Sequence, residues 1–122
     1  MNQAQAQAKN AYQTNQVVTA SPKKLLIMLY DGAIKNLRLA ELSLEEKNVE
    51  NVNKYLIKAQ DIITEFMTTL NFEDGGDVAR NLYQLYEYMN RRLIRANIDK
   101  DAELVREVRK YLEELRDTWT QI

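Results

Sequence analysis

The chain has 122 residues, of which 45% are hydrophobic and 29% charged, a balance typical of one globular domain and not of a disordered chain. Its net charge of −1 argues against nucleic acid or an anionic membrane as the main partner, and no run of about 18 apolar residues predicts a membrane span. The absence of histidine and cysteine excludes disulfides, Ser-His and Cys-His catalytic pairs, and zinc or di-iron sites built on histidine.

Residues 1–20 are expected to form a flexible leader and strap ahead of the folded domain, which we place at residues 21–122. Residues 1–11 are mostly alanine and glutamine, and such a segment cannot bury enough apolar surface to offset the entropy of ordering. The leader also lacks the apolar core of a secretory signal peptide, so we expect a soluble, cytoplasmic protein.

Tyr12, Val17 and Val18 are the first side chains in the chain that would gain from burial. Residues 12–20 therefore either form a short helix or strap that lies on the domain, or belong to a disordered leader. The sequence leaves both alternatives open.

The first long helix is predicted to begin at Pro22 and to run to about Lys47. Ser21 can accept a hydrogen bond from a free amide of the first turn, and proline suits the first helical position because no amide is needed there. On a wheel of about 100° per residue, one face of this helix carries an apolar core stripe. That stripe consists of Leu26, Leu29, Tyr30, Ala33, Leu37, Ala40 and Leu44.

A second stripe lies on roughly the opposite side of the same helix. It consists of Leu25, Met28, Gly32, Lys35, Leu39 and Leu42, with Lys35 as its polar member. A surface helix ordinarily carries charge on its outer face, so this apolar stripe predicts contact with a partner. Gly32 costs the helix about 1 kcal/mol relative to alanine, and its expected use is to let another backbone come close.

Three more amphipathic helices are predicted, separated by short polar segments at 48–51, 74–77 and 97–101. Asparagines in the first segment can cap the second helix, and Asp77 can cap the third after the glycine pair breaks the chain. The predicted core residues are Val52, Tyr55, Leu56, Ala59, Ile62, Ile63, Phe66, Met67 and Leu70 in the second helix, Val78, Leu82, Leu85, Met89, Leu93 and Ala96 in the third, and Leu104, Val105, Val108, Tyr111, Leu112, Leu115 and Trp119 in the fourth. The third helix carries a wider apolar band, extended by Ala79, Tyr83, Tyr86 and Ile94.

Four amphipathic helices joined by short turns must run antiparallel to bury their stripes together. The sequence therefore predicts an all-α fold, an up-down-up-down four-helix bundle with an N-terminal strap or short helix. Neither strand alternation nor an internal repeat is found in the sequence.

Apolar surface in excess of the core is the main functional candidate. It comprises the second stripe of the first helix, Ile57 on the second helix, and a flank from Tyr83 to Ile94 on the third. Contiguous apolar patches of this kind usually mark contacts for another chain. The alternative is permanent cover by the N-terminal strap or by a dimer mate.

Other patterns point only weakly to chemistry. Tyrosines 83, 86 and 88 alternate with arginines 80, 91, 92 and 95, as in single-strand nucleic-acid sites, but cations also suit the end of a helix. The pairs Glu45-Glu46 and Glu113-Glu114 lie on polar arcs, where a catalytic role is not expected. Gly75-Gly76 lacks the strand and the Lys-Ser/Thr of a phosphate loop. We predict no enzyme, no catalytic residue, no cofactor and no metal.

Several segments resemble one known family, in order and with similar spacing from about residue 11 to the end. They are Ala11-Tyr12, Thr19-Ala20-Ser21-Pro22, Met28-Leu29-Tyr30-Asp31-Gly32-Ala33, Lys58-Ala59-Gln60-Asp61-Ile62-Ile63, Leu85-Tyr86-Glu87-Tyr88-Met89, Arg91-Arg92-Leu93, Ala96-Asn97 and Leu115-Arg116-Asp117-Thr118-Trp119. The chain is similar here to the FliS flagellar secretion chaperones.

The resemblance implies a cytoplasmic helical bundle that binds the disordered C-terminal segment of flagellin, prevents premature polymerisation and aids delivery to the flagellar type III export gate. It further implies that the N-terminal segment can occupy part of the same groove and that Tyr12 matches a tyrosine associated with export-gate docking. The resemblance assigns no role to the alanine-glutamine leader, and its role stays open.

We therefore predict a flagellin groove, partners in flagellin and an export-gate component, no nucleic-acid partner, no membrane insertion, and a monomer with weak self-association at most. The residues assigned to the groove are Leu25, Met28, Gly32, Leu39, Leu42, Ile57, Tyr83 and Ile94. Tyr12 and Val17 are assigned to a strap that shields the groove or docks at the gate. The rival interpretation is a homo-oligomeric structural or adaptor bundle without a chaperone role.

Overall fold

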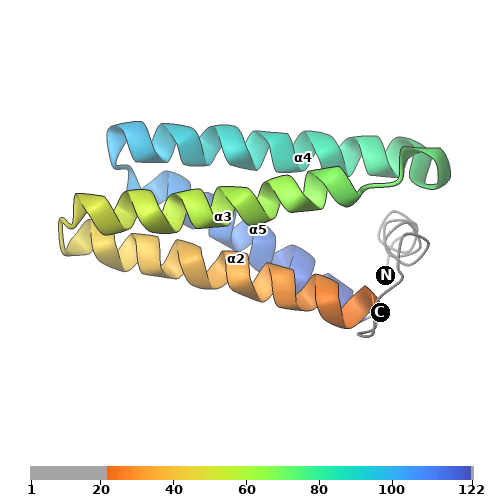
Figure 1. Cartoon of the computed structure of the whole chain (residues 1–122), viewed down its shortest axis with the longest axis horizontal. Helices are drawn as coiled ribbons and strands as arrows, with labels where there is room; N and C mark the ends of the chain where they lie inside the picture. Colours follow the sequence, from red (N-terminus) through yellow and green to blue (C-terminus); the bar gives the residue numbers. More distant parts are fainter. Residues whose placement is uncertain (1–21, 122) are drawn as a thin grey trace.

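A computed structural model describes residues 22–121, and within them the chain forms four α-helices and no strand (Figure 1). The helices are α2 (Pro22–Glu45), α3 (Val49–Thr69), α4 (Phe72–Asp99) and α5 (Ala102–Thr120). Consecutive helices run in opposite directions, so the predicted up-down-up-down four-helix bundle is confirmed. The expected strap at residues 12–20 and the Ser21 cap lie outside the described residues.

The four helices surround one core. Helix α2 packs against α3 and α5, and α4 packs against the same two helices. The core stripes predicted for α2 and α3 are confirmed, because all their members are buried or partly buried. The predicted core residues of α5 are also buried or partly buried, except Tyr111, which is exposed on the surface of the bundle. Each helix contributes one fully buried aromatic side chain: Tyr30, Phe66, Tyr86 and Trp119.

The start of α4 differs from the prediction. The helix begins at Phe72, and the side chain of Asn71 caps it by accepting a hydrogen bond from the amide of Asp74 at 3.0 Å. The predicted cap, Asp77, is therefore inside the helix. The glycine pair does interrupt the helical geometry, since Gly76 adopts φ 51° and ψ −128° and kinks the helix there. The cap at Asn71 stabilises an additional turn before the kink, and the wheel pattern could not reveal it because that turn is mostly polar.

The buried face and the end of α4 also differ in detail. Ala79 and Tyr86, predicted to lie at the edge of the apolar band, are completely enclosed, while Leu82 and Leu85 are only partly buried. Helix α4 packs against α3 on one side and α5 on the other, so its buried band is centred between them. The helix continues to Asp99, which places Ile98 inside it and not in the predicted turn.

Candidate partner-binding surface

Apolar side chains remain on the outside of the bundle after the core has been filled. The exposed large apolar residues are Leu25, Met28 and Leu42 on α2, Val49 and Ile57 on α3, Phe72, Tyr83, Ile94 and Ile98 on α4, and Tyr111 on α5. Most of them lie on α2, α3 and α4, in three separate groups. These groups form the candidate surface for a partner chain.

The first group lies along the outer face of α2. Met28 is 57% exposed and Leu42 is 50% exposed, while Leu25 is just above one third exposed and Leu39 is partly buried. Lys23, Lys24, Ile27 and Met28 line a shallow hollow of about 280 Å³ at the start of the helix. The predicted second stripe is thus accessible along the length of α2, and none of its large apolar members lies in the core.

Gly32 lies in this stripe and faces the neighbouring helix α3. A β-carbon placed on Gly32 would meet Cδ1 of Ile62 at 3.4 Å and no backbone atom of another element within 4 Å. The close backbone approach expected at Gly32 is therefore not found among the described residues. Its assignment to a partner groove stays a prediction.

The second group lies between α3 and α4. Ile57 of α3 and Ile94 and Ile98 of α4 line one shallow hollow of about 220 Å³. The polar residues that line this hollow are Asn53, Gln60, Asn97 and Lys100. The structure thus brings together two residues that the sequence assigned to one groove, Ile57 and Ile94.

The third group lies near the start of α4. The rings of Phe72 and Tyr83 meet edge to face, with centroids 5.8 Å apart, and both line an open hollow of about 600 Å³. Arg80, Gln84 and Glu87 complete its wall. Among the hollows formed by described residues, Tyr83 therefore lines a different one from Ile57 and Ile94.

The tyrosine and arginine pattern of α4 does not form an open stacking platform. Tyr86 is fully buried, and Tyr88 donates a hydrogen bond of 2.6 Å to Glu107. Every arginine in the chain lies in the described part and pairs with a carboxylate. The arginines of this pattern are therefore already paired within the fold and do not offer free guanidinium groups to phosphates.

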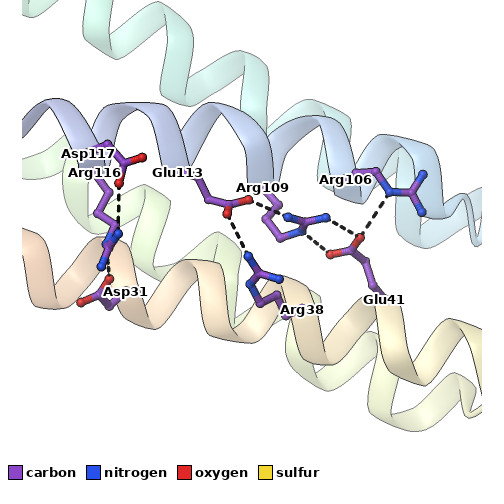
Figure 2. A network of polar contacts seen from close by, with 8 residues as sticks. All are labelled: Asp31, Arg38, Glu41, Arg106, Arg109, Glu113, Arg116 and Asp117. Atoms are coloured by element: carbon purple, nitrogen blue, oxygen red, sulfur yellow. Dashed lines mark hydrogen bonds and ion pairs between the residues drawn. The ribbon is translucent and has the colours of Figure 1, made fainter.

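Figure 2 shows the seam of ion pairs between α2 and α5. Arg109 donates to Glu41 at 2.6 Å and to Glu113 at 2.6 Å, and its side chain is only 15% exposed. Hydrogen bonding to Glu41, the largest influence, raises the pKa of Arg109. At the other end of the seam, Arg116 donates to Asp31 at 2.6 Å. This seam is polar and internally satisfied, so it separates the apolar outer face of α2 from α5.

A second polar cluster joins α4 to α5 around Glu107. Tyr88 donates to one carboxylate oxygen at 2.6 Å, and Arg92 donates to the other at 2.8 to 2.9 Å. Tyr111 adds a hydrogen bond at 3.3 Å. The hydrogen bond from Tyr88, followed by those from Arg92, holds the pKa of Glu107 below its ordinary value of 4.5 against the opposing effect of partial burial.

Four exposed apolar residues were not predicted as site residues. Ile98 falls in the predicted turn at 97–101, Phe72 lies between the predicted second helix and the segment 74–77 without an assignment, and Tyr111 is predicted in the core. Val49 was assigned to the connection before the second helix. The signal that would have found Ile98 is its spacing of one helical turn from Ile94.

Other kinds of site are not formed by the described residues. Across residues 22–121, no group of three or more acidic side chains can hold a metal ion. In that same part of the chain, no helix is long and apolar enough to cross a membrane.

Comparison with known proteins gives one consistent result. The family model described as "Flagellar protein FliS" matches residues 4–122. The chain is 43% identical to the flagellar secretion chaperone FliS of Bacillus subtilis strain 168 over 111 residues, which covers 91% of this chain and 82% of the relative. It is 42% identical to FliS of Salmonella typhimurium, over 87% of this chain and 79% of the relative, and 36% identical to FliS of Vibrio cholerae, over 88% and 79%. The chain therefore belongs to the FliS family of flagellar secretion chaperones.

Proposed function

We propose that this flagellar export chaperone binds the disordered C-terminal segment of flagellin, prevents its premature polymerisation and aids its delivery to the flagellar type III export gate. One observation carries the proposal. Exposed apolar side chains lie on the outer faces of α2, α3 and α4, outside a core that is already filled. A client segment that supplies its own apolar side chains would cover this surface.

The distribution of the surface supports an extended mode of binding. Residues of the three apolar groups line three shallow hollows on different helices. None of these three hollows is a deep pocket that would enclose one side chain of the client. A disordered segment can follow such a surface over a large area, and the entropy that it loses on ordering keeps the affinity moderate. Moderate affinity suits a client that must later be released for export.

The N-terminal residues complete the proposal. Tyr12 and Val17 shield the groove in the free chaperone, and Tyr12 docks at the export gate. Both lie outside the described residues, so this part of the proposal is supported by the sequence alone. The complex forms in the cytoplasm, where flagellin is made, and release follows from competition by the export machinery.

The experiment is a titration of the full chain with a synthetic peptide of the flagellin C-terminal segment. The variant Met28→Asp with Leu42→Asp changes the net charge by −2 on the apolar face of α2. Lys110→Asp is the matched control, because it also changes the charge by −2 but lies at an exposed position of α5. We expect calorimetry to show binding by the wild type and the control, and a loss of at least about tenfold in affinity for the double variant.

Folding and self-association are checked in the same samples. Because Met28 and Leu42 are half exposed, the double variant should retain its helical circular dichroism and unfold within about 1 kcal/mol of the wild type. Light scattering should give the mass of one chain for the free protein. A stable homo-oligomer that ignores the peptide would favour the rival adaptor interpretation. Binding that survives the double substitution would exclude this face from the client site.

A further inference from the structure

The hollow between α3 and α4 has both apolar and polar lining residues, one of which is a cation. Ile57, Ile94 and Ile98 form the apolar lining, and Ile98 is 67% exposed. Asn53, Gln60, Asn97 and Lys100 form the polar lining of the same hollow. Lys100 belongs to the turn that joins α4 to α5, where its backbone is left-handed with φ 54°. A peptide that packs on these isoleucines can therefore reach the ammonium of Lys100 at the end of α4.

The lysine is held in place by neutral groups. Its ammonium donates a hydrogen bond to the side-chain oxygen of Asn53 at 2.8 Å and another to the side-chain oxygen of Asn97. Among the described residues, no carboxylate lies within 4.0 Å of this ammonium, although every arginine has one. Lys100 is thus a partly buried, positioned cation without an ion pair within 4.0 Å among the described residues, with Asp99 and Asp101 on either side of it in the sequence.

The donors at this end match a carboxylate. An ammonium has three hydrogens, and two of them are used by the two amide oxygens. Because those oxygens face the ammonium, the NH₂ groups of Asn53 and Asn97 remain as further donors beside it. A carboxylate has two oxygens that accept several hydrogen bonds, and charge-assisted bonds of this kind are the strong ones.

A chain terminus fits this position better than an acidic side chain. The hollow is small, and it lies at the end of the bundle where α3 begins and α4 ends (Figure 1). A side-chain carboxylate would belong to a chain that must continue past Lys100, over a turn in which Asp99 and Asp101 flank the lysine, although Val49 at the start of α3 is also exposed there. A terminal carboxylate needs no continuation, and the preceding aliphatic residues can remain on the isoleucines.

We propose that Lys100, with Asn53 and Asn97, receives the C-terminal carboxylate of the bound client while the client's last aliphatic side chains pack on Ile57, Ile94 and Ile98. This inference rests on the proposed function, because it assumes that the client binds through its C-terminal segment. It deepens that function by fixing the direction in which the client lies on α3 and α4.

The test compares two forms of one synthetic peptide of the flagellin C-terminal segment, one with a free carboxylate and one with a terminal amide. Both are titrated at low salt into the full chain, as wild type and as Lys100→Met, which keeps the aliphatic stem and removes the charge. We expect amidation to weaken binding to the wild type about tenfold, and to change binding to Lys100→Met by less than about twofold. Lys110→Met is the matched control, and it should retain the full effect of amidation.

Other outcomes separate the carboxylate site from the proposed function. If acid and amide bind the wild type equally, the carboxylate site is wrong while the proposed function stands. If Lys100→Met weakens both peptides but amidation does not matter, the cation meets a side chain and the terminal assignment is overturned. If neither peptide binds the wild type, the proposed function and this inference both fail. The acid and amide comparison uses the wild type, so it does not depend on the folding of a variant, and Lys100→Arg should retain the effect of amidation.

Discussion

Tyr30 of α2 and Tyr86 of α4 share a hydrogen bond of 2.6 Å between their hydroxyl groups, across the fully buried centre of the bundle. The ring of Phe66 from α3 stacks against both, with centroid distances of 4.5 Å and 5.2 Å. The indole of Trp119 from α5 donates to the hydroxyl of Tyr30 at 3.3 Å. One aromatic layer therefore links all four helices, and its polar atoms are hydrogen-bonded inside the core.

Tyr30→Phe and Tyr86→Phe should each destabilise the bundle. Each substitution removes the hydrogen bond between the two hydroxyls, and Tyr30→Phe also removes the bond from the Trp119 indole, at about 1 to 2 kcal/mol for each buried bond. Urea unfolding followed by circular dichroism measures both losses. The double variant should lose less than the sum of the two, because both single changes delete the same bond between hydroxyls. Strictly additive losses would mean that this bond contributes nothing.

Arg109→Met should cost about 2 kcal/mol of unfolding free energy. Its guanidinium is largely enclosed between Glu41 and Glu113. When it is removed, two partly buried carboxylates lose the positive charge that offsets their desolvation. Arg95→Met is the control, because Arg95 forms an exposed pair with Asp99 within one helix and should contribute less than about 0.5 kcal/mol. Equal effects of the two substitutions in urea unfolding would contradict the importance assigned to the α2/α5 seam.

Alanine should act in opposite directions at two glycines. At Gly76 the backbone has φ 51°, which a residue with a β-carbon adopts with strain, so Gly76→Ala should destabilise by about 1 to 3 kcal/mol although no atom lies within 4 Å. At Gly32 the backbone is helical and the nearest contact, Ile62, is an ordinary one. Gly32→Ala should therefore raise stability by up to about 1 kcal/mol. A loss of stability at Gly32 would show tighter packing against α3 than the distance implies.

The fold could be predicted because apolar periodicity determines which face of each helix is buried. The stripe from Leu26 to Leu44 is in the core, as the wheel indicates. Helix ends were less predictable, since they depend on individual caps such as Asn71, and a helix wheel carries no information about polar turns. The placement of Ile98 in a turn, and the lack of any assignment for Phe72, follow directly from this limit.

The sequence predicts which apolar residues of the candidate site lie outside the core. It does not predict which of these residues lie next to one another. Periodicity identifies Met28 and Ile57 as apolar positions off the core stripe, and both are exposed. It cannot show that Ile57 and Ile94 line the same hollow, because that placement depends on how far α4 is shifted along α3. For the same reason the placement of Lys100 against Asn53, far apart in sequence, had no signal in the chain.

The polar cluster at Glu107 should make stability depend on pH in acid. The folded state lowers the pKa of Glu107 below 4.5, so its contribution is fully present above that value and is lost as the pH falls through the lowered pKa. The same hydrogen bond raises the pKa of Tyr88 above 10.0, so a second loss is expected as the pH rises beyond 10.0. Unfolding free energies of the wild type and Glu107→Gln, measured in urea across this range, test both.

The difference between the two proteins is the informative quantity, because other carboxylates titrate in the same acid range. Near neutral pH, Glu107→Gln should be less stable by about 1 kcal/mol, since the charge-assisted bonds with Tyr88 and Arg92 are weakened. Below the lowered pKa the wild-type carboxyl is protonated and resembles glutamine, so the two curves should converge. Glu114→Gln, at an exposed position of α5, is the control and should follow the wild type throughout. A constant gap between wild type and Glu107→Gln at every pH would show that the carboxylate charge is not what stabilises this contact.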